Sequence, residues 1–318
     1  MGRSAAVNGA NSPIRGLSVS AIVTICTGRK RLKPVATPAA LVGGTQAAVS
    51  RDWRAQVAGA PASSAARDLY AGRGFGLAQT AALLAGSPLY VVSAGLGLVM
   101  GDTIAPAYGL TISRGHEDSI AAKVIGTFDV GAWFADLLAG PYSERWAQVA
   151  ASRPGRVLVA ITRPYAEMVA DSLSALAPEA VDRLRIFGAG LSDALPLSLH
   201  GALLPYDERL DALFPGTRSD FAQRAMLHFV QHIAELPIDR AGEAAAVTSL
   251  LSRVEPPARP KRAQRTDDEI LALIADRLAP NASASRLLRN LRDDDGIACE
   301  QGRFAKLFRA AIARRDAA

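Results

Sequence analysis

Several residue types and patterns that define large classes of protein are scarce in this 318-residue sequence. It has 2 cysteines, Cys26 and Cys299, far apart and without the spacing of a disulfide framework or a zinc site. The longest apolar run, around residues 88–100, is shorter than the roughly 20 residues that a membrane-spanning helix needs. We therefore expect a cytoplasmic protein without a membrane segment, a metal ion or a cofactor. Aromatic residues are only 6%, so Ala, Leu and Val must fill most of the core.

The overall composition is that of a globular protein with a basic balance. Hydrophobic residues make up 49% and charged residues 21%, which argues against disorder over most of the chain. Lys and Arg number 36 against 30 Asp and Glu, a net charge of +6. That excess suits anionic partners such as nucleic acid, although many basic enzymes share it. The length favours one main domain with a smaller appendage.

Strand-like and helix-like segments alternate through the first two thirds of the chain. We predict strands at residues 19–26, 89–94, 155–161 and 182–188, and helices at residues 74–86, 142–152, 164–176, 220–235 and 240–253. This alternation predicts an α/β fold, a Rossmann-like and mostly parallel sheet with flanking helices. Residues 32–64 lack periodicity and suggest an irregular insertion with at most a short helix around residues 46–54.

Composition also divides the chain. We predict a disordered tail at residues 1–16, an α/β ligand-binding domain with a helical layer at 17–253, a proline-rich basic linker at 254–265, and a helical module at 266–318. In the last helix Phe304 and Leu307 begin an apolar stripe, and the opposite side carries Arg303, Lys306 and Arg309. This pattern predicts a helix-turn-helix-like module that binds DNA or RNA; a bundle for protein contact would show the same inner face.

The loops after the predicted strands carry the residues that suit a ligand. Ser93 is followed by Gly95 and Gly97, which allow close approach of the backbone to an anion. The first strand ends before Gly28, Arg29 and Lys30, and Arg163 follows the third strand. Because ligands bind beyond the carboxyl ends of parallel strands, these loops predict a phosphate-binding rim. A tight packed turn and a solvated basic loop are the alternatives.

Candidate reactive groups lie near the same loops. Cys26 is a candidate nucleophile beside basic residues, or else a small core residue. Asp68 and Asp102 are candidate acid–base groups, although a helix cap or an arginine pair explains each equally well. His228 and His232 have the spacing of paired metal ligands, but no third ligand is evident and we interpret them as structural.

Three motifs together resemble a known family. The segments "TICTGRKR", "SAARDLYAGRGF" and "YVVSAGLGLVMGDTIAPAYGLTI" resemble those of a bacterial and phage domain family of unknown function, which is distantly similar to the peroxide-stress YaaA group. Members of that family occur near 7-deazaguanine DNA-modification genes. The likeness covers roughly residues 19–176. It implies a pocket formed by Cys26, Thr27, Gly28, Arg29, Lys30, Arg67, Asp68, Tyr70, Ser93, Gly97, Asp102 and Tyr108.

Two departures from the family pattern bear on chemistry. This chain reads Cys-Thr-Gly where the family usually reads Ser-Cys-Gly, which moves the thiol to the opposite side of a strand. It also has Gly95 and Leu96 where members often have a lysine and an aromatic residue. Binding is thus better supported than catalysis.

The sequence predicts a nucleotide- or modified-base-binding protein that acts on or with nucleic acid. As an enzyme it would be a hydrolase or transferase on a purine-like base, in DNA base modification or defence against foreign DNA. One alternative is a non-catalytic DNA-binding regulator or nucleotide sensor. The other is a protein-interaction subunit. The sequence does not predict the oligomeric state.

Overall fold

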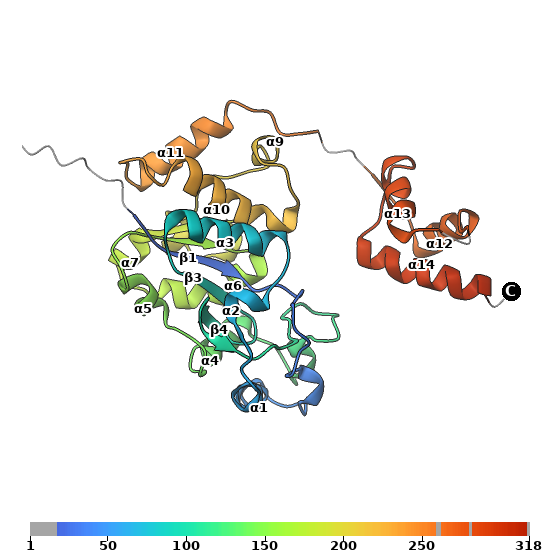
Figure 1. Cartoon of the computed structure of the whole chain (residues 1–318), viewed down its shortest axis with the longest axis horizontal. Coiled ribbons are helices and arrows are strands. Elements are labelled where there is room, and N and C mark those ends of the chain that lie inside the picture. Colours follow the sequence, from blue (N-terminus) through green and yellow to red (C-terminus); the bar gives the residue numbers. More distant parts are fainter. Residues whose placement is uncertain (1–17, 259–261, 280–281, 317–318) are drawn as a thin grey trace, which may run out of the picture. The chain divides into compact units, whose positions relative to one another are not determined.

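Two structural units make up the chain, and each is described by itself. The structure, a computed structural model, describes residues 18–258, 262–279 and 282–316 (Figure 1). The units are Met1–Pro256 and Pro257–Ala318. Their boundary falls inside the predicted linker at 254–265, of which residues 259–261 lie outside the described part. The predicted tail at residues 1–16 also lies outside it.

A mostly parallel sheet forms the centre of the first unit. In the described part of the chain it has five strands in the order β4-β3-β1-β6-β7. These are β1 (Val19–Ile25), β3 (Leu89–Ser93), β4 (Gly97–Met100), β6 (Arg156–Ala160) and β7 (Leu184–Phe187). Only β4 pairs in the antiparallel sense, with β3. Counted within the sheet, the order is 3-2-1-4-5, as in Rossmann-like folds, and the predicted α/β class is confirmed.

Helices cover both faces of this sheet, which explains why its strands are apolar on both sides. Ile22 of β1 packs in one core, and Ala21 and Val23 of the same strand pack in the other. The first core contains α1 (Gln46–Gly59), α3 (Arg73–Ala85), α10 (Phe221–His232) and α11 (Arg240–Leu251). The second contains α4 (Val130–Leu137), α5 (Trp146–Ala151), α6 (Arg163–Ser174) and α8 (Leu197–His200). Figure 1 shows α3 and α10 side by side along one face.

Short elements connect these layers. They are η1 (Pro38–Ala40), β2 (Ser64–Ala65), α2 (Ala66–Leu69), β5 (Ile104–Ala105), η2 (Ile120–Lys123), α7 (Pro178–Arg183), η3 (Ser192–Ala194), α9 (Leu210–Leu213) and η4 (Arg218–Asp220). The predicted short helix at 46–54 extends to Gly59 as α1, whose first turn is capped by the side chain of Thr45. β4 was not predicted, because its residues have the composition of a loop.

A buried ion-pair cluster connects α11 to the sheet. Glu243 of α11 pairs with Arg156 of β6 and with Arg185 of β7, and all three side chains are buried. Arg156 also donates to the carbonyl oxygen of Ala234 at 2.8 Å. One carboxylate thus neutralises two arginines and connects two strands to the helical layer.

The second unit has its own apolar core. It contains β8 (Ala263–Gln264), α12 (Asp267–Asp276), α13 (Ala284–Asp293), β9 (Ile297–Ala298) and α14 (Gln301–Asp316). Ile270, Leu291 and Phe304 are among the buried residues of this core. The capping box at Thr266 and Glu269 starts α12. The parallel pairing of β8 with β9 was not predicted.

Among the residues that the structure describes, no helix combines the length and the apolar composition that a membrane crossing requires.

Candidate ligand-binding site

The turns after β1 and β3 meet at the carboxyl edge of the sheet. The N–H of Cys26 donates to the carbonyl oxygen of Val92 at 2.9 Å, and the N–H of Ala94 donates to the Cys26 sulfur at 3.4 Å. On its other side β1 pairs with β6, whose chain continues to β7. From β1 the chain crosses to β3 on one side, and from β6 it crosses to β7 on the other side. Rossmann-like proteins bind ligands in the crevice at such a point.

Cys26 and Tyr165 come together across this point. The Cys26 sulfur lies 3.0 Å from the hydroxyl oxygen of Tyr165, which is in the first turn of α6. Cys26 is only 5% exposed, whereas Tyr165 is half-buried. Burial, followed by the nearby Cys26, raises the pKa of Tyr165 well above its usual range. Arg163 was predicted as a site residue from this segment, but Tyr165 was not. Its position two residues after Arg163, in the first turn of the helix that follows β6, was the sequence signal for it.

A short backbone pairing places Lys30 beside the same cluster. The N–H of Arg31 donates to the carbonyl of Leu69, and the N–H of Ala71 donates to the carbonyl of Arg29, both at 2.9 Å. The Lys30 ammonium consequently lies 4.2 Å from the centre of the Tyr108 ring. Burial lowers the pKa of Lys30, and the nearby Cys26 and Asp118 oppose that shift.

Three hydroxyl groups form a buried chain beneath Lys30. The Tyr108 hydroxyl lies 2.7 Å from that of Ser93 and 3.2 Å from that of Tyr70. All three residues are fully buried, and burial raises the pKa of both tyrosines. Each of the three sequence motifs thus contributes a polar side chain to one cluster: Lys30 from the first, Tyr70 from the second, Ser93 and Tyr108 from the third.

The turn after Ser93 is closed, which corrects its interpretation as an open anion-binding loop. The N–H groups of Gly95 and Leu96 both donate to the Ser93 hydroxyl oxygen, at 3.3 and 2.9 Å. A Cβ atom added at Gly95 would lie 2.6 Å from the Tyr108 ring. Gly97 has a φ of +85°, which β4 needs at its start. Packing against Tyr108 and the turn geometry therefore explain both glycines.

Two tryptophans, to which no role was assigned from the sequence, donate hydrogen bonds to the backbone of this turn. The indole N–H of Trp53 donates to the carbonyl of Gly95 at 2.7 Å, and that of Trp133 donates to the carbonyl of Ala94 at 2.9 Å. Both rings are fully buried. They fix the turn, and no sequence pattern marked them because their partners are backbone atoms distant in the chain.

Arg67 and Asp102 lie at the opposite edge, which corrects the prediction that they share a pocket with Cys26. Asp68 is exposed, and its carboxylate lies 3.9 Å from the Arg67 guanidinium. Antiparallel β4 returns the chain to the start of β3, where the N–H of Gly101 donates to the carbonyl of Leu89 at 2.7 Å. Leu89 and Ser93 are separated by about 13 Å along the strand. Asp102 forms an ion pair with Arg67, and both line a separate cavity of about 490 Å³.

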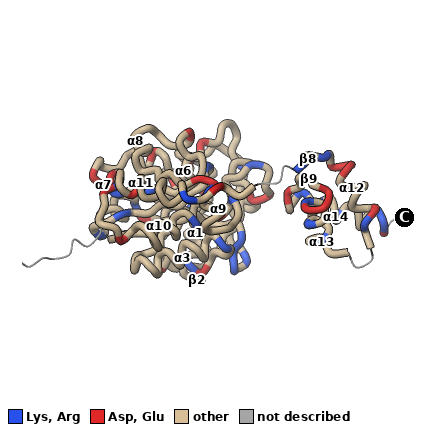
Figure 2. The backbone as a smooth tube through the Cα atoms, turned by 90° about the horizontal axis from the view of Figure 1, so that it is seen from above, with Lys and Arg blue, Asp and Glu red and all other residues tan. Residues whose placement is uncertain are grey.

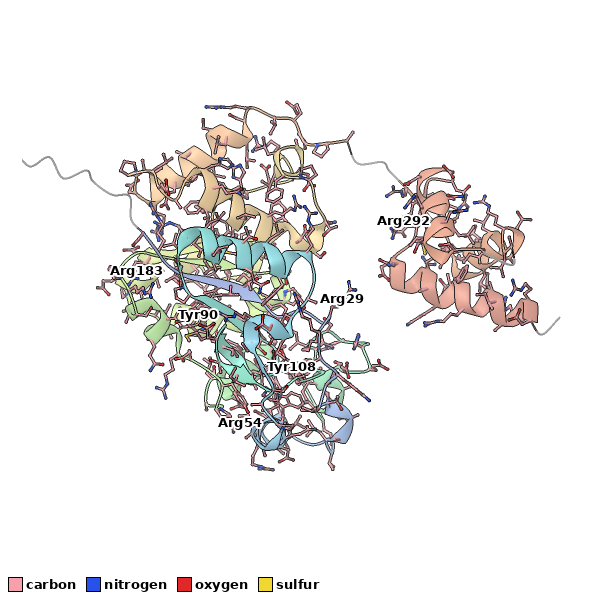
Figure 3. All side chains as sticks on the ribbon, in the orientation of Figure 1. Arg29, Arg54, Tyr90, Tyr108, Arg183 and Arg292 are labelled. Carbon is pink, nitrogen blue, oxygen red and sulfur yellow. The ribbon has the colours of Figure 1, made fainter. Side chains whose placement is uncertain are left out.

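The exposed surface of the carboxyl edge is basic. Thr27 is half-buried, and Gly28 and Arg29 are exposed. The Arg29 guanidinium has no ion-pair partner among the described residues (Figure 3). Arg163, at the start of α6, is exposed and pairs with Glu167 at 3.1 Å and with Asp193 at 4.0 Å. We call this surface, Thr27–Arg29 with Arg163 and Tyr165, the rim.

The histidine pair of α10 has a structural environment. His228 is buried and its Nδ1 lies 3.0 Å from the hydroxyl oxygen of Tyr206. His232 is exposed, with its ring 4.6 Å from that of His228. Within the described ranges no three or more His, Cys, Asp or Glu side chains are grouped so as to hold a metal ion.

One of the three residues in the predicted cationic stripe of α14 has a carboxylate partner among the described residues. Arg303 pairs with Asp267 at 2.6 Å and donates to the carbonyl of Arg265. Lys306 and Arg309 are exposed, and neither has a partner among the described residues.

Comparison of this chain with protein-family models, curated proteins and solved structures gives no match.

Proposed function

We propose that this protein binds a nucleotide or a modified base at the rim and acts on or with nucleic acid. The observation that carries this proposal is the cluster at the switch point of the sheet. There the Cys26 thiol, the Tyr165 hydroxyl and the Lys30 ammonium gather beneath an exposed basic loop. Arg29 and Arg163 suit a phosphate group, and the tyrosine ring and thiol suit the flat face of a base.

A hydrolase or transferase reaction on a purine-like base would rest on Cys26 in this arrangement. The Cys26 sulfur accepts the N–H of Ala94 at 3.4 Å and lies 3.0 Å from the Tyr165 hydroxyl oxygen, with which it can exchange a proton. The setting of DNA base modification or defence against foreign DNA comes from the family resemblance alone.

A non-catalytic nucleotide sensor is the second candidate, and one observation favours it. Asp102, a carboxylate proposed for acid–base chemistry, lies at the amino edge of the sheet, where it pairs with Arg67. The rim is at the opposite, carboxyl edge. Binding without turnover is the expected behaviour of such a protein.

The second unit supports a nucleic-acid partner by its charge. Residues 257–318 carry 13 Lys and Arg against 9 Asp and Glu. We propose that α12, α13 and α14 act as a helix-turn-helix-like module, since the three helices share one core.

Mass spectrometry of small molecules that co-purify with the full chain identifies the ligand class. Calorimetric titration with GMP, AMP and 7-deazaguanine then tests the site. Arg29→Met is expected to weaken binding of a phosphate-bearing ligand roughly tenfold, because a charged hydrogen bond is lost. Asp102→Asn, at the other edge, is expected to leave binding unchanged. Equal binding by Arg29→Met and the wild type, or loss of binding in Asp102→Asn alone, contradicts the proposal.

A further inference from the structure

An open hollow on the second unit is lined mainly by arginines. It has a volume of about 750 Å³ and lies where the parallel strands β8 and β9 end. Its described lining includes four arginines and one carboxylate: Arg262, Arg265, Arg292, Arg303 and Glu300. Figure 2 shows basic positions beside β8 and β9. The lining therefore carries a surplus of positive charge.

Backbone carbonyl groups hold several of these guanidinium groups in place. Arg262 donates to the carbonyl of Arg292 at 2.8 Å, and Arg292 donates twice to the carbonyl of Cys299, at 3.0 and 2.7 Å. A carbonyl oxygen orients a guanidinium but does not neutralise its charge. Arg262, Arg265 and Arg303 each also pair with a carboxylate outside the described lining. Arg292 has no carboxylate partner among the described residues, so it is the lining arginine whose charge is not neutralised.

The Glu300 carboxylate in this lining is held by backbone N–H groups. It accepts the N–H groups of Gly302 and Arg303, both at 2.9 Å, at the start of α14. These hydrogen bonds lower the pKa of Glu300. The carboxylate satisfies the helix N-terminus, and the arginines remain as the groups in the hollow that suit an anion.

A row of arginines on α13 leads to the hollow. Arg286, Arg289 and Arg292 follow one another at intervals of three residues, so they share one side of the helix. Leu288 and Leu291 on the opposite side pack in the core. Arg286 and Arg289 are exposed and have no partner among the described residues.

We infer that the Arg286–Arg289–Arg292 side of α13 and the arginine hollow bind the phosphodiester backbone of a nucleic acid. This inference deepens the proposed function, because it assigns the nucleic-acid contact to a surface that the sequence did not indicate. The planar guanidinium binds phosphate oxygens through paired N–H groups, and a row of such groups matches the repeated charge of a phosphodiester chain. Lys306 and Arg309 of α14, by contrast, are not among the described residues that line the hollow.

Two matched double variants of the full chain test this inference. Arg286→Ala/Arg289→Ala and Lys306→Ala/Arg309→Ala each remove two exposed charges, from α13 and from α14. Fluorescence anisotropy with labelled duplex DNA, single-stranded DNA and RNA, between 50 and 200 mM NaCl, measures the affinity and its salt dependence. Circular dichroism verifies that both variants are folded.

The α13 variant is expected to weaken binding roughly tenfold and to reduce the slope of log affinity against log salt by about 2. The α14 variant is expected to change affinity by less than about twofold. The inference is overturned if the wild type binds none of the three nucleic acids in a salt-dependent way, or if the α14 variant loses as much affinity as the α13 variant. Neither result affects nucleotide binding at the rim, which is measured separately with Arg29→Met.

Discussion

The sulfur of Cys26 lies 3.0 Å from the hydroxyl oxygen of Tyr165, although the two residues are 139 positions apart. Parallel pairing of β1 with β6 produces this contact, because the residues that follow both strands emerge at the same edge. The thiol is therefore held just below the exposed rim, where a bound ligand would cover it. The ligand-binding proposal depends on this arrangement.

Gly95→Ala is predicted to destabilise the protein by about 1–3 kcal/mol, because the new methyl group would overlap the buried Tyr108 ring. Urea denaturation followed by circular dichroism measures the change in the free energy of unfolding. Gly28→Ala is the matched control, since a Cβ atom at Gly28 meets nothing within 4 Å. It is expected to change stability by less than about 0.5 kcal/mol. Equal stability of the two variants would show that Gly95 does not pack as described.

Glu243→Gln is predicted to cost about 3–5 kcal/mol, because Arg156 and Arg185 would lose their shared buried counter-charge. Glu167→Gln, which removes the exposed partner of Arg163, serves as the control and should cost less than about 1 kcal/mol. Thermal and urea unfolding of both variants measure the difference. A Glu243→Gln protein as stable as the control would mean that this cluster does not hold α11 against the sheet.

Acid is predicted to weaken the first unit through His228. Burial, with the adjacent His232, lowers the pKa of His228 from 6.5 to about 4. Between pH 4 and pH 6.5 the unfolded chain binds a proton at His228 and the folded chain does not. With respect to this group, the free energy of unfolding is therefore highest above pH 6.5 and decreases as the pH falls towards 4. The expected loss is on the order of 2–3 kcal/mol.

The free energy of unfolding of the wild type and of His228→Gln, measured from pH 7 to pH 4.5, tests the role of His228. Glutamine retains a partner for the Tyr206 hydroxyl and does not titrate. The variant should therefore show a shallower decline with falling pH. Parallel pH profiles for the two proteins would assign the acid sensitivity to other groups.

The strands with apolar residues on both faces could be predicted from the sequence, and β4 could not. Residues 21–25 and 157–160 are continuous runs of β-branched and apolar residues, as buried parallel strands require. β4 begins at Gly97, and the neighbouring glycines resemble a loop in composition. Its pairing with β3 is a tertiary contact that local patterns do not encode.

The error in the candidate site follows from the missed strand. With residues 97–100 interpreted as a loop, Asp102 belonged at the carboxyl edge beside Ser93. As a strand, the same residues carry Asp102 back to the amino edge, and Tyr108 then returns to Ser93. The meeting of the Cys26 and Ser93 turns was predictable, because it depends only on adjacent parallel strands. The contact of Tyr165 with Cys26 was not predictable, because the position of helix α6 determines it.

Ligand protection of Cys26 tests the central claim most directly. The full chain is alkylated with iodoacetamide with and without saturating nucleotide or 7-deazaguanine, and mass spectrometry follows each cysteine-containing peptide. A ligand at the rim is predicted to slow alkylation of Cys26 and to leave that of Cys299, in the second unit, unchanged. Unaltered alkylation of Cys26 under conditions in which calorimetry shows the ligand bound would contradict the account.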